Sequence, residues 1–401
     1  MTATQSLAWV PSHVPAAGRL FVALAGRLRH GFFHLVTPDG EMHIGNAGSP
    51  LFADLRILDW RACARILRSG DVGFAEAYRD GWIDSGNLTS LLRLAIVNAA
   101  TLDQAIFGNA LARSLLRLRH LLRRNSRRGS RRNIHLHYDL GNDFYRLWLD
   151  EGMAYSSAWF NGNVHGSLAD AQTAKYQRAC DLLRVVPGMD VLEIGCGWGG
   201  LMEMACGRGA RVHGITLSEE QRRYTAARLA GEPQARVELR DYRDLDAAYD
   251  AIASIEMFEA VGESYWATYF QTLVRCLRHG GRALVQSITI DAAHFERYRS
   301  GTDFIQQFIF PGGMLPSRER FIRLAEQHGM RVIDRLDFGR DYAETLRHWR
   351  ERFDNADKAG RLPERLDARF RDLWRYYLMY CEGGFRGGGI DVAQVTLVKQ
   401  G

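Results

Sequence analysis

The sequence lacks any run of about 18 uncharged apolar residues, the length that a membrane-spanning helix requires, so we predict no transmembrane segment. It also lacks a secretory signal, because the apolar stretch 21–26 is short and has arginines on both sides. Its six cysteines show no Cys-x-x-Cys pair and no nearby histidine spacing. A disulfide framework and a structural metal site are therefore not expected, and a reducing cytoplasm fits.

Acidic residues are missing between Asp103 and Asp139. Nine arginines lie in that window, and without them the formal net charge of +6 would become −3. They are Arg113, Arg117, Arg119, Arg123, Arg124, Arg127, Arg128, Arg131 and Arg132. We interpret 111–133 as a basic amphipathic helix that leads into a basic linker, with 113–132 lying on an anionic membrane surface at about 1 kcal/mol of attraction per basic residue. A solvated linker and nucleic-acid binding are the alternatives.

A length of 401 residues predicts two domains. Residues 1–110 read as a small α+β domain, with a hairpin around Pro38-Asp39-Gly40 and helical spacing at 58–67, 71–82 and 88–98. Lipid binding and homodimer formation both remain open as its role.

Residues 134–401 alternate between strand and helix patterns and form the second predicted domain. Five strands with crossover helices predict a parallel sheet covered on both faces, and the last of two later strands is expected to insert antiparallel. Seven strands in this order are typical of a class I methyltransferase, an α/β Rossmann-like fold. The predicted strands are 190–194, 211–216, 235–240, 250–254, 282–288, 331–338 and 392–398.

Three alternating glycines, Gly195, Gly197 and Gly199, follow the first of these strands. They let the backbone turn sharply and approach a ligand, to which the next helix presents free amides. Both NAD and S-adenosylmethionine (SAM) sites use such a loop. Glu193 before the loop favours SAM, because its carboxylate can orient the loop or receive a methionine ammonium. The second strand also lacks the terminal acid that an NAD site uses for the ribose.

Neutral hydrogen-bonding groups follow the second strand instead, and an Asp-Tyr-Arg sequence at the usual adenine position follows the third. The predicted SAM contacts after these two strands are Thr216, Leu217, Ser218, Gln221, Asp241, Tyr242 and Arg243, and Cys196 joins them from the glycine loop.

After the fourth strand the sequence lacks the Asn/Asp-Pro-Pro-aromatic motif of enzymes that methylate amino groups of nucleic acids. We therefore expect no nucleic-acid substrate. The aromatic segment 304–310 and the following 311–316 suit an apolar substrate channel, although a core segment reads the same way.

Several motifs in order resemble the cyclopropane-fatty-acyl-phospholipid synthases, which include the mycolic acid cyclopropane synthases, over roughly residues 50 to 400. They are segments 73–82, 137–143, 155–158, 191–200, 241–245, 257–262, 310–317, 376–381 and 385–386. The resemblance implies that SAM methylates the double bond of a phospholipid acyl chain at the cytoplasmic face of the membrane. The resulting carbocation then loses a proton to a bound bicarbonate, and a cyclopropane ring closes.

The resemblance also implies the residues that hold the bicarbonate. Glu259, Tyr342 and the backbone of Ile288 match the family, whereas Ser157 replaces a usual cysteine and Gln286 a usual histidine. Serine and glutamine still donate hydrogen bonds to an anion, but the loss of histidine removes a titratable group.

Further family positions include Tyr155 and Ser156 as cofactor contacts, with His135 and His137 as structural residues. Cys381 matches a cysteine marked as the family's active site, for which we favour a structural role because the chemistry needs no thiol. We expect a cyclopropane ring in the acyl chain as the leading product. A methyl-branched acyl chain, a nucleic-acid methyltransferase and a lipid-binding module without catalysis are the alternatives.

Overall fold

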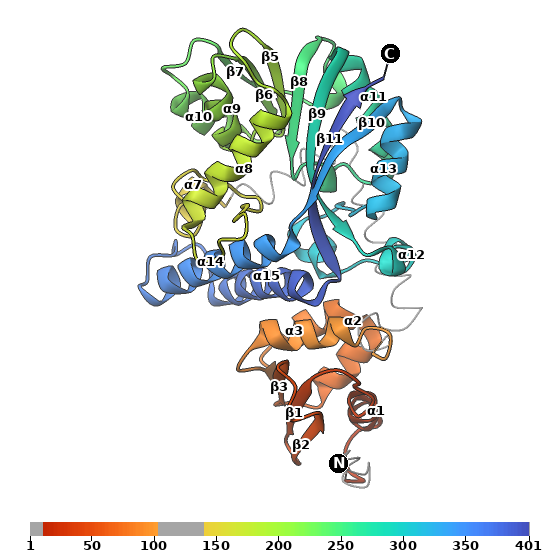
Figure 1. The fold of residues 1–401 in the computed structure, drawn as a ribbon. Coiled ribbons are helices and arrows are strands. Elements are labelled where there is room, and N and C mark those ends of the chain that lie inside the picture. Colours follow the sequence, from red (N-terminus) through yellow and green to blue (C-terminus); the bar gives the residue numbers. More distant parts are fainter. Residues whose placement is uncertain (1–10, 103–139, 401) are drawn as a thin grey trace. The chain divides into compact units, whose positions relative to one another are not determined.

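The computed structural model describes residues 11–102 and 140–400, which form two compact units (Figure 1). The first unit contains 11–102 together with 297–309 and 364–389, and the second contains most of 140–363 and the last strand. The sequence prediction placed both later segments in the second domain. The difference arises because α15 (Ala368–Gly387) packs on α3 (Leu88–Val97): a Cβ on Gly383 would lie 2.7 Å from the Leu92 Cβ.

The first unit is an α+β domain, as predicted, around a four-stranded sheet of order β2-β1-β3-β4. The expected hairpin is present, but the sequence analysis missed β3, which pairs parallel to β1. The two predicted helices at 58–67 and 71–82 form one element, bent at Gly70 where φ is +61°. The remaining elements are α1 (Ala16–Ala25), β1 (Phe32–Thr37), β2 (Gly40–Gly45), β3 (Phe52–Ile57), α2 (Arg61–Arg79) and β4 (Ile83–Asp84).

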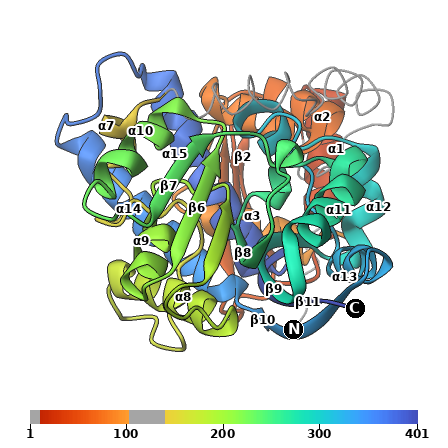
Figure 2. The same cartoon turned by 90° about the horizontal axis from the view of Figure 1, so that it is seen from above.

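The second unit contains a seven-stranded sheet of order β10-β11-β9-β8-β5-β6-β7, part of which can be followed from β7 to β9 in Figure 2. β7, β6, β5, β8 and β9 run parallel, while β11 lies antiparallel between β9 and β10. The predicted class I methyltransferase topology is confirmed. The strands are β5 (Asp190–Ile194), β6 (Arg211–Thr216), β7 (Ala235–Leu239), β8 (Tyr249–Ile255), β9 (Leu277–Ile290), β10 (Met330–Asp337) and β11 (Ile390–Lys399).

Helices pack along this sheet, with α9 and α10 on β6 and β7, and α11 and α13 on β9 and β10 (Figure 1). The central β5 is buried at four of its five positions, as expected of a strand covered on both faces. The helices are α7 (Asn142–Tyr145), α8 (Leu168–Leu182), α9 (Gly200–Gly207), α10 (Glu219–Arg228), α11 (Trp266–Cys276), α12 (Ala292–Ser300), α13 (Arg318–Gln327) and α14 (Gly339–Lys358). Short helical turns of the second unit are η2 (Tyr242–Asp244), η3 (Phe258–Ala260) and η4 (Glu263–Tyr265), whereas η5 (Ile305–Ile309) belongs to the first unit.

The basic segment 111–133, with its nine arginines, lies outside the described residues, as do His135 and His137. Across the described ranges, none of the helices has the length and apolar character needed to cross a membrane.

Candidate active site

The loop between β5 and α9 has the geometry that its glycines predict. Gly195, Gly197 and Gly199 all have positive φ, at +82°, +53° and +85°. The Gly195 and Cys196 amides both donate to the carbonyl of Ile215 on β6, which holds the loop against the neighbouring strand. Only glycine adopts three such conformations without strain, so the loop is built for close approach of a ligand to its backbone.

Glu193 is the penultimate residue of β5, two positions before Gly195, and its side chain is buried. Burial raises the pKa of its carboxyl to about 8. Its Oε2 is buried without a hydrogen-bond partner among the described residues. A buried carboxylate oxygen without a partner is costly, and the ammonium group of SAM has the charge and donors to satisfy it.

The predicted contacts after β6 are buried and bond to one another. Thr216 Oγ1 donates to Gln221 Oε1 at 2.8 Å, and the Ser218 hydroxyl caps α10 by accepting from the Gln221 amide at 3.3 Å. Leu217 lies half-buried in the same turn. The turn therefore presents neutral polar groups at the carboxyl edge of the sheet, where doubly wound folds bind ligands.

After β7, Asp241 and Arg243 form a buried two-point ion pair, with distances of 2.8 and 2.6 Å. The Arg243 guanidinium also lies 5.2 Å from the centre of the Tyr265 ring, and Tyr242 is buried beside it. The paired charges and the stacked ring fix the shape of the predicted adenine-binding turn.

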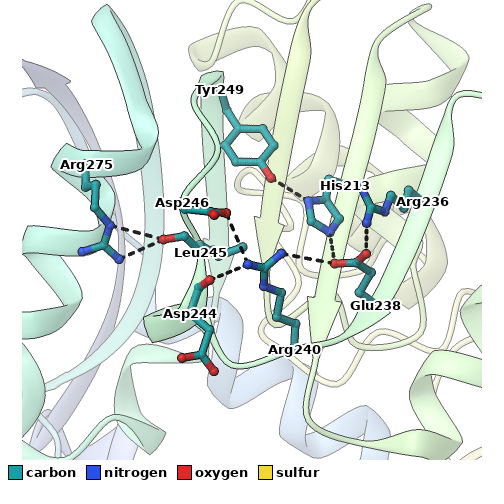
Figure 3. Close-up of polar contacts among 9 residues, drawn as sticks. All are labelled: His213, Arg236, Glu238, Arg240, Asp244, Leu245, Asp246, Tyr249 and Arg275. Atoms are coloured by element: carbon teal, nitrogen blue, oxygen red, sulfur yellow. Dashed lines mark hydrogen bonds and ion pairs between the residues drawn. The ribbon is translucent and has the colours of Figure 1, made fainter.

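A polar network on β6 and β7 anchors the segment that follows this turn (Figure 3). His213 bonds to the Tyr249 hydroxyl at 2.6 Å and to Glu238 at 3.0 Å. Arg240 pairs with Asp246 at 3.3 Å, and Arg275 of α11 donates to the Leu245 carbonyl at 3.2 and 3.1 Å. The network is structural, because it holds residues 244–246 rather than pointing reactive groups at the turn.

Aromatic rings surround Tyr155, the first predicted residue of the 155–157 segment. Its ring centre lies 5.4 Å from both Trp148 and Trp349 and 6.5 Å from Phe310. Ser156 is buried and accepts a 2.6 Å hydrogen bond from Lys175 of α8. Burial lowers the pKa of this lysine to about 8. The segment thus joins an aromatic wall to a buried polar cluster.

The sequence analysis missed Glu256, which directly follows β8 and is half-buried. Its Oε1 accepts from the Ser157 amide at 2.8 Å and from Gln286 Nε2 at 2.7 Å, and its Oε2 accepts from the Tyr342 hydroxyl at 2.6 Å. A signal was present, because an acid directly after a predicted parallel strand lies at the ligand-binding edge of the sheet.

Glu259 lies three residues further on, in η3, where its Oε1 accepts from the Ile288 amide. Its Oε2 is buried without a hydrogen-bond partner in the described part of the chain. Burial, followed by the negative charge of Glu256, raises the pKa of Glu259 to about 8. Burial also raises the pKa of Glu256, although the hydrogen bonds from Tyr342, Ser157 and Gln286 oppose that rise. The two carboxyls therefore differ in their hydrogen bonding, because Glu256 accepts three hydrogen bonds whereas one oxygen of Glu259 has no partner in the described part of the chain.

Three of the residues expected to hold bicarbonate lie close together, but they donate their hydrogen bonds to the carboxylate of Glu256. Tyr342 and Gln286 donate to its carboxylate, and Ser157 uses its backbone amide while its hydroxyl donates to the Ala158 carbonyl at 2.9 Å. The Ile288 amide binds Glu259. These donors therefore do not fit an added bicarbonate, and we correct the expected role of the Ser157 side chain.

Gln394 of β11 is a second residue that the sequence analysis missed. Its Nε2 donates to Gln286 Oε1 at 2.9 Å, and both side chains are fully buried. With its oxygen occupied, the Gln286 amide points its nitrogen at Glu256. Because Gln394 and Gln286 lie on strands that are distant in sequence, no local sequence pattern predicts this hydrogen bond.

Cys381 lies on α15 in the first unit, whereas the carboxyl pair lies in the second. Burial strongly raises the pKa of its thiol, with a further rise from Asp303. A thiol held protonated is a poor nucleophile, in keeping with the structural role that we favoured.

The seven-stranded sheet, the glycine loop and the orphaned Glu193 oxygen together define a class I SAM-dependent methyltransferase. The family described as mycolic acid cyclopropane synthetase matches residues 125–395, and this chain belongs to it.

Among its relatives, "Tuberculostearic acid methyltransferase UfaA1" of Mycobacterium tuberculosis is 40% identical, with 84% of this chain and 81% of the relative covered. "Cyclopropane-fatty-acyl-phospholipid synthase" of Escherichia coli K12 is 35% identical over 88% of this chain and 89% of the relative. A solved structure of mycolic acid cyclopropane synthase CmaA1, complexed with SAH and CTAB, has a TM-score of 0.62 and 32% identity. That match covers 67% of this chain and 98% of CmaA1.

Proposed function

We propose that this chain transfers the methyl group of SAM to the double bond of an unsaturated acyl chain in a membrane phospholipid. The observation that carries the proposal is the pair of carboxyl groups, Glu256 and Glu259, at the same sheet edge as the glycine loop. An alkene has no proton to lose before it is methylated, so a base is needed only for the carbocation that follows.

The surroundings of Tyr155 suit such a carbocation. Tyr155 lies among the rings of Trp148, Trp349 and Phe310, and aromatic rings stabilise positive charge without attacking it. SAM, when bound, supplies the electrophilic methyl group. The contribution of the protein is to hold the weakly nucleophilic alkene against the cofactor, to exclude water and to accept a proton afterwards.

The product that we propose first is a cyclopropane ring, as in the named Escherichia coli relative. A methylated open chain is the second candidate. It is favoured by the altered donor set around Glu256, in which Ser157 and Gln286 replace the expected cysteine and histidine. The 40% identical Mycobacterium tuberculosis relative is named a methyltransferase, which agrees with the second candidate.

We further propose that the basic segment 113–132 attracts the enzyme to anionic phospholipid. Its nine arginines concentrate positive charge in a stretch without acidic residues. Attraction of this kind falls as salt rises. Neutralising several of these arginines should therefore reduce sedimentation with anionic vesicles at low salt, and unchanged binding would contradict this role.

The main test uses unsaturated phospholipid vesicles and methyl-labelled SAM, followed by mass spectrometry and NMR of the released acyl chains. Label in the acyl chain supports the proposal, and its absence contradicts it. Ring protons in the NMR spectrum select the cyclopropane, whereas label without ring protons selects the open chain. Labelled RNA or DNA, offered in parallel, would identify a nucleic-acid methyltransferase instead.

A further inference from the structure

The carboxylate of Glu256 lies where the resemblance implies an external anion. Three donors converge on it, namely the Tyr342 hydroxyl, the Gln286 amide and the Ser157 backbone amide, at 2.6, 2.7 and 2.8 Å. A carboxylate and a bicarbonate each present two acceptor oxygen atoms on one planar carbon. The side chain therefore satisfies the same donors that would bind the anion.

The backbone at Glu256 is also unusual. Its φ of +50° lies in the left-handed region, which glycine adopts readily and glutamate does not. A side chain kept at such a position points to a function that offsets the strain. The strained turn is what directs the carboxylate back toward Tyr342 and Gln286.

The next residue places this turn against the cofactor loop. A Cβ built on Gly195 would lie 2.9 Å from Met257 Cγ, so Met257 packs directly on the first glycine. Because β8 and β5 are parallel neighbours, Glu256 and the glycine loop leave the same edge of the sheet. Glu256 is thus the direct neighbour of Met257, which packs on the glycine loop that we expect to bind SAM.

We propose that the Glu256 carboxylate replaces an external bicarbonate as the base of the reaction, which makes the enzyme independent of bicarbonate. This inference rests on the proposed methylation of an acyl double bond. Gln394 acts as a positioning residue, because it orients Gln286 toward the carboxylate.

The proton-transfer step balances without another reactant. After methyl transfer, one carbon of the former double bond is cationic. A C–H bond of the new methyl group breaks, and its electron pair forms the bond to the cationic carbon that closes the ring. For an open-chain product the pair forms a double bond instead. In both cases the proton moves to Glu256, and solvent removes it before the next cycle.

The test compares Glu256→Gly with Glu256→Gln in bicarbonate-depleted buffer, with labelled acyl product as the readout. Glycine suits the left-handed backbone and leaves room for an anion, whereas glutamine keeps the bulk and removes the charge. We expect both variants to lose about 100-fold or more in turnover, the contribution typical of a general base. Added bicarbonate should restore Glu256→Gly, leave Glu256→Gln inactive and leave the wild type unchanged.

Glu263→Gln is the matched control, because Glu263 lies in the same segment but pairs with Arg320 at 2.7 Å. It should retain wild-type turnover without bicarbonate. A wild type that needs bicarbonate, or a Glu256→Gly variant that keeps its turnover without it, would overturn the inference.

Calorimetric titration of bicarbonate into the SAH-loaded proteins separates this inference from the proposed function. Binding to Glu256→Gly and not to the wild type supports the replacement even if no lipid is methylated. Binding to the wild type contradicts it. Thermal unfolding of each variant checks that the comparison is made between folded proteins.

Discussion

Two turns at one edge of the sheet follow different rules. The glycine turn, 195–199, follows β5, and the carboxylate turn, 256–259, follows β8. The first takes its shape from backbone conformations that only glycine adopts freely. The second holds glutamate at φ +50° and depends on donors from α14, β9 and the 155–157 segment. The shape of the glycine turn thus depends on neighbouring residues, whereas the hydrogen-bond donors around the Glu256 carboxylate come from distant parts of the chain.

The largest effect is expected from Gly195→Val, which breaks the glycine turn. Its side chain would meet Met257 at 2.9 Å from the Cβ and would require a β-branched residue at φ +82°. We expect SAM affinity to fall by about 100-fold, since strain of this kind costs about 1–3 kcal/mol. Calorimetric titration with SAM measures it. Gly188→Ala, at φ +83° with no atom near its Cβ, controls for backbone strain alone and should bind normally.

Glu259→Gln tests the carboxylate turn without touching the glycine turn. Turnover should fall by about 100-fold because the turn loses one of its two carboxyls, and such groups typically contribute that much. SAM affinity should stay near the wild-type value. Undiminished turnover would remove Glu259 from the mechanism.

Gln394→Leu tests whether a residue that does not contact Glu256 still affects the carboxylate turn through Gln286. Without its partner, Gln286 is free to rotate its amide away from Glu256, and we expect turnover to drop by about 10-fold, the worth of one hydrogen bond to a charged group. Thr396→Val, two residues along the same strand and fully buried, is the control. Equal losses in both variants would indicate a general packing effect.

The free energy of unfolding should depend on pH differently in the wild type and in the Glu259→Gln variant. The folded state keeps the Glu259 proton up to a pKa of about 8, whereas the unfolded chain releases it near 4.5. The folded state therefore binds more protons between these values, and its stability falls as pH rises from about 4.5 to about 8. Urea unfolding of both proteins without SAM at pH 5, 6.5 and 8 measures this. The wild type should lose stability relative to the variant across this range, and parallel curves would contradict the raised pKa.

Cys381→Ala should have the smallest effect. The thiol is held protonated by burial, which makes it a poor nucleophile. We expect turnover within about twofold of the wild type and a stability loss of about 1 kcal/mol for the lost contacts. A large fall in turnover with unchanged stability would restore the cysteine to the active site.

Local patterns predicted much of the fold. Strands 190–194 and 211–216 match β5 and β6 residue for residue. β5 contains the short apolar pattern typical of a buried parallel strand. β3 was missed, and the segments 297–309 and 364–389 were placed in the wrong unit. Membership of a unit depends on long-range contacts such as the hydrogen bond of Thr89 to Glu382, which no local pattern encodes.

By itself, the sequence determined the succession of strands and helices, the glycine turn and the SAM chemistry. The strands and the glycine turn depend on residues close together in the chain, and the order of these elements indicated the class I sheet. The sequence also brought Tyr342, Gln286, Ser157 and Glu259 into one site through family motifs. Only the tertiary structure decided what those residues hold. The Glu256 carboxylate reaches them because a left-handed turn after β8 folds it back across the sheet edge, a direction set by three-dimensional contacts rather than by spacing.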